Sequence, residues 1–372
     1  MNILINCSNL KVSGGLQVAD SVCGQLSRFS AHNFFVVLSK YLDNTKERIQ
    51  NIANVEVFTY DIPNSFYSII MGRDKFLDGL VEEKRIDAVL TIFGPSRWCP
   101  RVKHLCGFAM PALVIPESPF FTQMSSAQRL KWKLWCIVRQ WSFQQSANYF
   151  WTENPFISER VKKLLRKENV YTVSNYYNQV FDTLENWRRS KTLPSFKGIT
   201  CLSVSSPIGH KNFKIILDVL KSMKRRWPEF KVRFVLTFNS DSLDVPADMR
   251  DYFVFVGKVD VSECPYLYEQ ADIMFMPTLL ECFTATYPEA MRMEVPIVTT
   301  DLEFARGLCG DAACYYSAVD AKAAADAIYK VAMNKDYARQ LIENGKKQLM
   351  KYDNYERRAE KLVKILEEIT ID

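Results

Sequence analysis

Two acidic residues that follow an apolar run are the strongest candidates for chemistry in this chain of 372 residues. Glu281 and Glu289 lie eight positions apart, after the apolar run 273–276 and at the start of a helical pattern. The turn between them can bring both carboxylates and several backbone N–H groups onto one ligand, because a helix N-terminus carries unpaired donors. This combination suits a sugar nucleotide, with Glu281 on sugar hydroxyls, the turn amides on phosphates and Glu289 on the ribose.

Glu289 also fits a purely structural role. Thr286 stands three positions before it and Pro288 lies early in the helix, which is the pattern of a capping box. The two roles are compatible. For Glu281 the only structural alternative is that of a solvated loop carboxylate.

Strands must end beside these residues, and the chain offers a regular series of them. Short apolar runs alternate with helical patterns, which predicts an α/β fold built on parallel sheets. We expect strands at 2–7, 34–38, 55–60, 88–93, 103–108, 149–152, 170–174, 199–204, 231–238, 253–256, 273–276 and 297–300.

A polar stretch at 187–197, close to Pro194 and Gly198, interrupts this alternation. We therefore predict two doubly wound domains, residues 1–186 and 187–351, with the charged amphipathic helix at 352–372 packing back on the first. In such domains ligands bind at the carboxyl ends of the strands, so the site is expected in the cleft between the domains.

Composition excludes several classes of protein. With 48% hydrophobic and 24% charged residues, the chain is typical of a globular protein and not of a disordered or collagen-like one. A net charge of +6 is too small to indicate nucleic-acid binding by itself. The ten cysteines form no C-x-x-C pair, and the N-terminus lacks a signal-peptide pattern, so we expect reduced thiols in a cytoplasmic protein.

The region around the two glutamates resembles the retaining glycosyltransferases of the family 4 type, which have the GT-B fold of two Rossmann-like domains facing a cleft. Their signature is a glutamate, seven residues and a second glutamate, followed by a helix and a strand. Further landmarks occur in the order expected along nearly the whole chain: Gly14-Gly15-Leu16, Asn175, Phe181, His210-Lys211-Asn212, Phe255-Val256-Gly257 and Gly310-Asp311-Ala312-Ala313.

This resemblance implies transfer of a sugar from a UDP- or GDP-linked donor, held by the second domain, to a hydroxyl of an acceptor on the first. The acceptor would be a free or lipid-linked glycan of surface polysaccharide assembly. Glu281 and Lys211 are the implied catalytic residues, with Lys211 on the diphosphate. The implied donor-binding residues are Gly14, Gly15, Ser206, Lys211, Gly257, Glu281, Cys282, Phe283, Thr284 and Glu289. No D-x-D triplet occurs, so we expect no metal site, no cofactor and a metal-independent mechanism.

The chain departs from the family pattern at several positions. Ser206 replaces an arginine, and Lys214 or Lys258 would have to compensate for its charge; the glycines of a Gly-Phe-Gly triplet are replaced by Cys282 and Thr284. His104 lies at the start of a strand, away from the expected site, and is interpreted as structural. These departures motivate an alternative, a catalytically inactive GT-B protein that serves as partner or scaffold of an active transferase. An epimerase or phosphorylase of similar shape has no specific support.

Residues 126–168 carry nine basic and three acidic side chains, a local charge of 9 − 3 = +6. Trp132 and Trp135 share one helix face with Arg139, which predicts peripheral attachment to an anionic membrane at its inner, cytoplasmic side. A solvated or dimer-forming helix is the alternative. The opposite face is expected to pack on the core, and it consists of Leu130, Leu134, Ile137, Val138 and Trp141.

Overall fold

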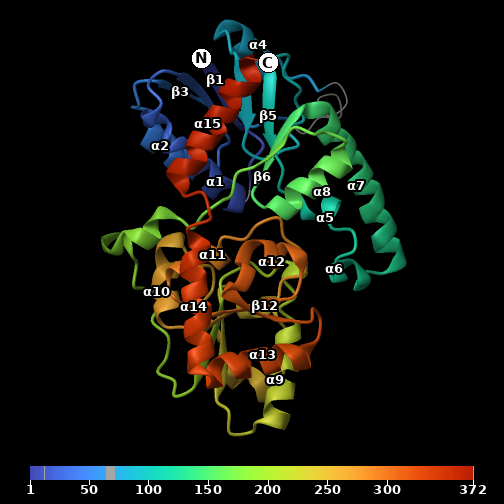
Figure 1. The fold of residues 1–372 in the computed structure, drawn as a ribbon, viewed down its shortest axis with the longest axis vertical. Helices are drawn as coiled ribbons and strands as arrows, with labels where there is room; N and C mark the ends of the chain where they lie inside the picture. The colour runs from blue at the N-terminus through green and yellow to red at the C-terminus, as the bar shows by residue number, and fades with distance from the viewer. Residues whose placement is uncertain (12, 64–71, 372) are drawn as a thin grey trace. The chain divides into compact units, whose positions relative to one another are not determined.

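The computed structural model describes residues 1–11, 13–63 and 72–371, which form two α/β units (Figure 1). The first unit comprises Met1–Pro116, Ser126–Asn175 and Asp353–Asp372, and the second comprises Glu117–Ser125 and Tyr176–Tyr352. The main break therefore falls after Asn175, whereas the sequence placed it after residue 186. The polar stretch at 187–197 belongs to the second unit.

The first unit contains a seven-stranded parallel sheet in the order β3-β2-β1-β4-β5-β6-β7. Alternation along β1 covers both of its faces: Ile3 and Ile5 join one core cluster, and Leu4 joins the other. The strands are β1 (Asn2–Cys7), β2 (Asn33–Leu38), β3 (Val55–Thr59), β4 (Ala88–Thr91), β5 (Lys103–Gly107), β6 (Tyr149–Thr152) and β7 (Val170–Thr172).

Helices cover both faces of this sheet. Side-chain caps begin α4 and α8, where Asp74 and Asn154 accept hydrogen bonds from backbone N–H groups of the first turn. The helices of the first unit are α1 (Ser13–Cys23), α2 (Asp43–Ile49), α4 (Lys75–Glu83), α5 (Pro111–Val114), α7 (Ser126–Ser146), α8 (Pro155–Leu165) and α15 (Tyr355–Ile371).

The second unit contains a six-stranded parallel sheet in the order β10-β9-β8-β11-β12-β13. The last strand is absent from the sequence prediction. The strands are β8 (Ile199–Ser203), β9 (Val232–Leu236), β10 (Phe253–Phe255), β11 (Ile273–Met276), β12 (Ile297–Thr300) and β13 (Ala313–Tyr316). The helices are α6 (Pro119–Thr122), α9 (Ile215–Arg226), α10 (Cys264–Glu269), α11 (Thr286–Arg292), α12 (Glu303–Cys309), α13 (Ala321–Met333) and α14 (Lys335–Leu349).

The C-terminal helix α15 lies in the first unit beside α1 (Figure 1). Its apolar residues Leu362, Leu366 and Ile369 are part of the same core cluster as β1. Arg358 is buried with them, and its guanidinium donates to Asn175 and to Ser21. Burial lowers the pKa of Arg358 to about 10, opposed by the nearby charge of Glu153.

The orientation of α7 is the reverse of the prediction. Its buried residues are Ser142, Phe143 and Ser146, and the ring of Phe143 lies 4.7 Å from that of Phe108. The predicted core face is exposed instead: Leu130, Leu134, Ile137, Val138 and Trp141. The helix has apolar side chains on two sides, and Phe143, with small serines beside it, determines which side packs inward.

The two tryptophans predicted to lie on the surface are half-buried. The rings of Trp132 and Trp135 meet edge to face with centroids 4.8 Å apart. The Arg139 guanidinium lies 5.3 Å from the Trp135 ring centroid, so these three side chains pack on one another. The membrane surface predicted from them is therefore not supported in that form.

His104 is structural in this fold. It is buried, its Nε2 lies 2.8 Å from Thr91 Oγ1, and its Nδ1 lies 2.6 Å from the Ser146 carbonyl oxygen. Burial lowers its pKa to about 4, which favours the neutral ring. All ten cysteines are free thiols. Among the described residues, no helix is long and apolar enough to cross a membrane.

The packing of β5 against its neighbours predicts a position that tolerates no side chain. A Cβ at Gly107 would lie 1.8 Å from the Ile92 carbonyl oxygen and 2.8 Å from Trp151 Nε1. We expect Gly107→Ala to lower the free energy of unfolding by about 3 kcal/mol. Gly79→Ala, at an exposed site in α4 with no atom within 4 Å, is the matched control and should be neutral or stabilising by about 0.5–1 kcal/mol. Urea unfolding measures both, and equal stability of the two variants would contradict the packing described.

Candidate functional site

Two neighbouring strands of the second unit place the candidate residues at one sheet edge. β8 and β11 pair in parallel, so their carboxyl ends lie side by side. Beyond β8 the chain forms a short 3-10 helix over Gly209–Lys211, and beyond β11 it forms the turn that carries Glu281. This topology brings together two residues that are 70 positions apart in the sequence.

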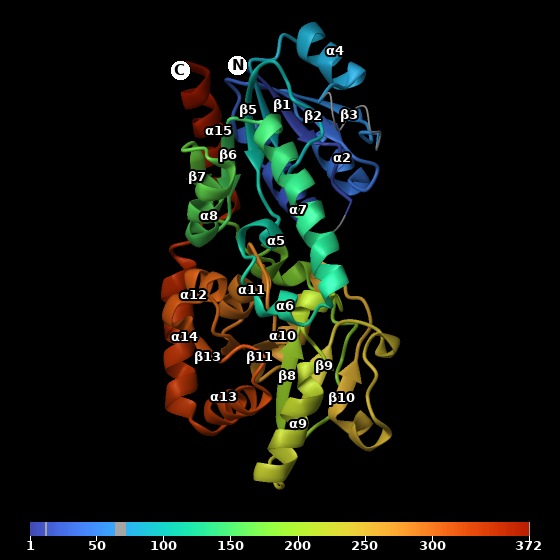
Figure 2. The same ribbon diagram turned by 90° about the vertical axis from the view of Figure 1, so that its right-hand side faces the viewer.

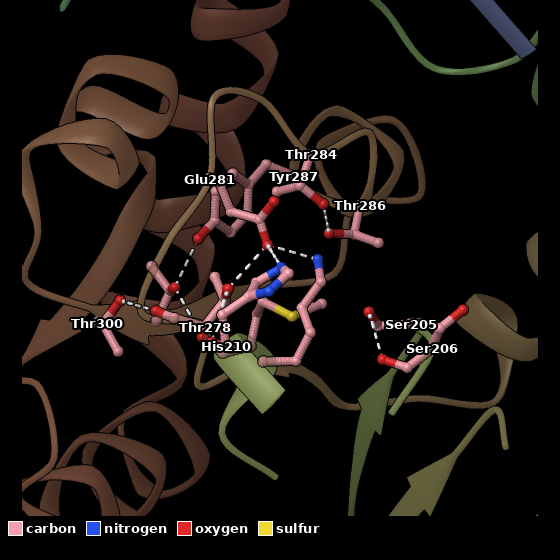
Figure 3. A network of polar contacts seen from close by, with 12 residues as sticks. Ser205, Ser206, His210, Thr278, Glu281, Thr284, Thr286, Tyr287 and Thr300 are labelled. Carbon is pink, nitrogen blue, oxygen red and sulfur yellow. Dashed lines mark hydrogen bonds and ion pairs between the residues drawn. The ribbon is translucent and has the colours of Figure 1, made fainter. Parts of the chain in front are cut away.

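Lys211 and Glu281 form a nearly buried ion pair. Lys211 Nζ lies 2.5 Å from Glu281 Oε1, and the two side chains are 11% and 10% exposed. The Thr278 hydroxyl donates to the same oxygen at 2.8 Å, and His210 Nε2 lies 3.9 Å from it (Figure 3). All these contacts involve Oε1 of the carboxylate. The ammonium group and the hydroxyl offset the cost of removing the carboxylate from water.

His210 faces this carboxylate as a mainly neutral ring. Burial lowers the pKa of His210; the charge of Lys211 acts in the same direction, whereas that of Glu281 opposes it. The Phe120 ring packs against the imidazole edge to face, with centroids 6.0 Å apart. Phe120 belongs to the segment Glu117–Ser125, which is part of the second unit.

Backbone and side-chain hydrogen bonds fix the turn that carries Glu281. The Leu279 N–H donates to the His210 carbonyl oxygen at 2.8 Å. The buried Ser118 hydroxyl donates to the Leu279 carbonyl oxygen at 2.6 Å. On the β12 side, the Thr300 hydroxyl donates to the Thr278 carbonyl oxygen at 2.7 Å. The turn is thereby held by three separate segments, which limits movement of the carboxylate.

Glu289 lies in the first turn of α11, apart from the ion pair. It is buried, and the Tyr268 hydroxyl donates to its Oε2 at 3.2 Å. Burial raises the pKa of Glu289 to about 7, and the hydrogen bond from Tyr268 acts against this. No described contact joins Glu289 to Glu281, so the two carboxylates have different environments.

The capping-box interpretation of Glu289 is wrong. Ala285 is the N-cap of α11 and makes no side-chain cap hydrogen bond. Thr286 is already helical, and its hydroxyl lies 2.9 Å from the Thr284 hydroxyl (Figure 3). The hydroxyl of Tyr268, from α10, replaces the expected local partner of the carboxylate.

The other predicted donor-binding residues of this unit have mixed environments. Cys282 and Thr284 are buried, and Phe283 is half-buried with its ring edge-on to that of Tyr352 at 6.1 Å. Ser206 is exposed and lies to one side of the ion pair, with no contact to it in Figure 3. Gly257 follows β10 at φ +72°, a conformation that favours glycine.

The predicted glycine loop of the first unit is part of a helix. α1 begins at Ser13, so Gly14 and Gly15 lie in its first turn and not in a loop before it. A Cβ at Gly15 would lie 3.2 Å from Leu10 Cδ2, whereas Gly14 has open space. Their role toward a donor stays a prediction.

Comparison with known proteins adds a family match for part of the chain and a fold for the whole of it. Residues 185–348 match the family described as Glycosyl transferases group 1. No curated protein matches the chain in sequence. Similar solved structures include a sucrose-phosphate synthase from Thermosynechococcus elongatus, with a TM-score of 0.70, 13% identity, and coverage of 100% of this chain and 99% of that one.

Two further structures resemble the chain over its whole length. WaaG, a glycosyltransferase involved in lipopolysaccharide biosynthesis, has a TM-score of 0.66 at 14% identity and covers 98% of this chain and 99% of its own. Anabaena HepE in complex with UDP-glucose has a TM-score of 0.66 at 13% identity, with 99% of each chain covered. The fold is GT-B. Together with the family match, this supports a GT-B glycosyltransferase.

Sequence reasoning named both members of the ion pair but missed the groups that hold them. Thr278 stands three positions before Glu281 and His210 stands next to Lys211, so their proximity in sequence was the available signal. Ser118 and Tyr268 come from distant segments, and only the tertiary fold reveals them. Among the described residues, no group of three or more His, Cys, Asp or Glu side chains is placed to hold a metal ion.

The environment of Glu289 predicts a pH-dependent contribution to stability. Its pKa is about 7 in the folded protein and about 4.3 in the unfolded chain, so the folded state binds the proton more tightly between these values. Wild-type protein should therefore lose stability as the pH rises through this window. Glu289→Gln stays neutral and should gain stability relative to wild type between about pH 5 and about pH 8. Urea unfolding at both pH values measures the difference, and a constant difference would show that Glu289 does not titrate as described.

Proposed function

We propose that this protein is a retaining, metal-independent glycosyltransferase of the family 4 type. It transfers a sugar from a UDP- or GDP-linked donor to a hydroxyl of a glycan acceptor. The observation that carries the proposal is the Lys211–Glu281 pair, at the ends of two central strands within the segment matched to Glycosyl transferases group 1. The complex of HepE with UDP-glucose supports the donor class.

The charges of this pair match the two ends of such a donor. A diphosphate offers oxygens that can take the place of Glu281 at the Lys211 ammonium, and the sugar offers hydroxyls that can donate to the released carboxylate. Both groups then stay paired when the donor binds, so neither is left as an isolated buried charge. Lys211 also faces the negative charge that grows on the diphosphate as the glycosidic bond breaks.

The proposed transfer exchanges one bond at the anomeric carbon for another. The bond between the anomeric carbon and the diphosphate oxygen breaks, and the bond electrons leave with the diphosphate. A bond from the acceptor oxygen forms on the same face of the sugar, and the acceptor proton passes to a departing phosphate oxygen. Lys211 stabilises the leaving group and Glu281 orients the sugar, while Glu289 is assigned to the ribose.

The remaining donor contacts belong to the proposal as well. Ser206 provides no charge where an arginine is usual, and the exposed Lys214 and Lys258 are the candidates for replacing it. The first domain, with Gly14 and Gly15, is assigned to the acceptor and the donor phosphates. The acceptor is placed in surface polysaccharide assembly, free or lipid-linked, with the enzyme on the cytoplasmic face of the cell membrane. The resemblance to WaaG supports this assignment.

A catalytically inactive partner or scaffold is the second candidate. The observations that favour it are the exposed serine at position 206 and the burial of Cys282 and Thr284, where the family has glycines. Titration calorimetry of the pure protein with UDP- and GDP-sugars distinguishes the two candidates. Absence of binding at millimolar ligand would favour the scaffold.

Substitution of the ion pair tests the transferase directly. Glu281→Ala should lower kcat/KM at least tenfold, about 1.4 kcal/mol, because the sugar loses its orienting carboxylate. Lys211→Met should weaken binding of the free nucleoside diphosphate as well as transfer. Both are measured by product formation from the donor that binds in calorimetry.

A control must separate these effects from loss of folding. The double variant Glu281→Gln/Lys211→Met leaves no unpaired buried charge and should keep its cooperative unfolding while losing transfer. Lys221→Met removes a lysine from the exposed pair with Asp218 on α9 and should leave activity unchanged. Full activity in the Glu281→Ala variant would remove that residue from the site.

A further inference from the structure

The outer face of α7 is an exposed apolar stripe. Its members are 61%, 58%, 63%, 54% and 39% exposed: Leu130, Leu134, Ile137, Val138 and Trp141. Among the described residues, thirteen large hydrophobic side chains are exposed, and five of them lie in this one stripe. Scattered exposed apolar residues are normal, but a continuous group of this kind indicates a binding surface.

Helical geometry makes these five residues a single surface. Their spacing of four, three, one and three positions keeps them on one side of a helix with 3.6 residues per turn. From Leu130 to Trp141 the stripe extends for about 16 Å along the axis. The opposite side of the helix packs on the first unit through Phe143. In Figures 1 and 2, α7 lies at the margin of that unit with no other element of the unit over its outer side.

The charges around the stripe have one sign. α7 contains no aspartate or glutamate over its 21 residues and has four basic side chains. Lys131 and Lys133 are exposed and lie on the two flanks of the stripe. Arg129, in the first turn of α7, is exposed as well. Long basic side chains on such flanks can extend past the apolar surface toward negative headgroups.

We propose that the α7 stripe docks this protein on an anionic lipid bilayer. The apolar residues enter the boundary between headgroups and acyl chains, with Trp141 suited to that depth, and Lys131 and Lys133 contact the headgroups. This deepens the membrane location in the proposed function by naming a surface opposite to the tryptophan pair. The docking itself needs no catalytic activity.

Charge complementarity favours a bilayer over a second copy of the chain. A symmetric dimer through this stripe would pair α7 with a second α7, which brings basic side chains together with no acidic residue on the helix to compensate. An anionic lipid surface supplies the missing negative charge at every position along the helix. The absence of acidic side chains on α7 therefore favours a lipid surface over a second copy of the chain.

Flotation of the full chain with lipid vesicles tests whether the α7 stripe binds an anionic bilayer. Wild-type protein should float with vesicles that contain about 30% phosphatidylglycerol at about 0.1 M salt, and much less with pure phosphatidylcholine vesicles. Leu134→Ser/Ile137→Ser should lower the bound fraction at least fivefold, and so should Lys131→Glu/Lys133→Glu. Both double variants replace exposed side chains, so thermal unfolding should be unchanged.

Two controls locate the effect on α7. Leu184→Ser replaces an equally exposed leucine in the second unit and should bind vesicles like wild type. Glu281→Gln should also bind like wild type even where transfer is lost, so failure of the proposed reaction and failure of docking are distinguishable. No flotation of wild type, or undiminished flotation of Leu134→Ser/Ile137→Ser, would overturn the proposal. Self-association that this double variant abolishes, without vesicle binding, would overturn it in favour of a second copy.

Discussion

The contact between the Lys211 ammonium and the Glu281 carboxylate is the interaction around which the second unit is arranged. Each group is close to fully buried, and either charge alone in that position would cost several kcal/mol. The chain must therefore hold both at contact distance. Adjacent parallel strands provide the placement, and the hydroxyls of Thr278, Ser118 and Thr300 supply the hydrogen bonds that keep the turn in position.

A pair of this kind also restricts what can bind. A ligand that removes only one partner leaves the other buried and uncompensated, so a simple anion gains little from Lys211. A molecule with an anionic group and several hydroxyls a few atoms apart can satisfy both at once. This physical requirement, and not the fold, connects the geometry with a nucleotide sugar, because GT-B architecture alone does not fix an activity.

The sequence predicted the sheets well and the side-chain partners poorly. Apolar runs of four to six residues gave β1, β6, β11 and β12 to the residue, because buried parallel strands need continuous apolar segments. β13, with the sequence Ala-Cys-Tyr-Tyr, is also apolar but contains no β-branched residue, so its strand signal is weaker. Glu281 was predicted from its position after a strand and Lys211 from the family resemblance, but their contact depends on strand order, which is a property of the whole sheet.

Two of the wrong predictions, the cap at Glu289 and the inward face of α7, have the same origin. The spacing of Thr286 and Glu289 is that of a local cap, yet the hydroxyl of Tyr268 from another helix takes the carboxylate. Periodicity shows that α7 has apolar residues on two sides, but it cannot tell which side meets Phe108 and Phe150. In both cases a tertiary contact outweighs a correct local pattern.

Because α15 belongs to the first unit, that unit cannot be completed until the second unit has been synthesised. Leu362, Leu366 and Ile369 fill the core beside β1, and Arg358 reaches Asn175 and Ser21. During synthesis these residues leave the ribosome after every residue of the second unit. The sheet of the first unit is thus made before the second unit and completed after it, and until α15 arrives it lacks part of its apolar cover.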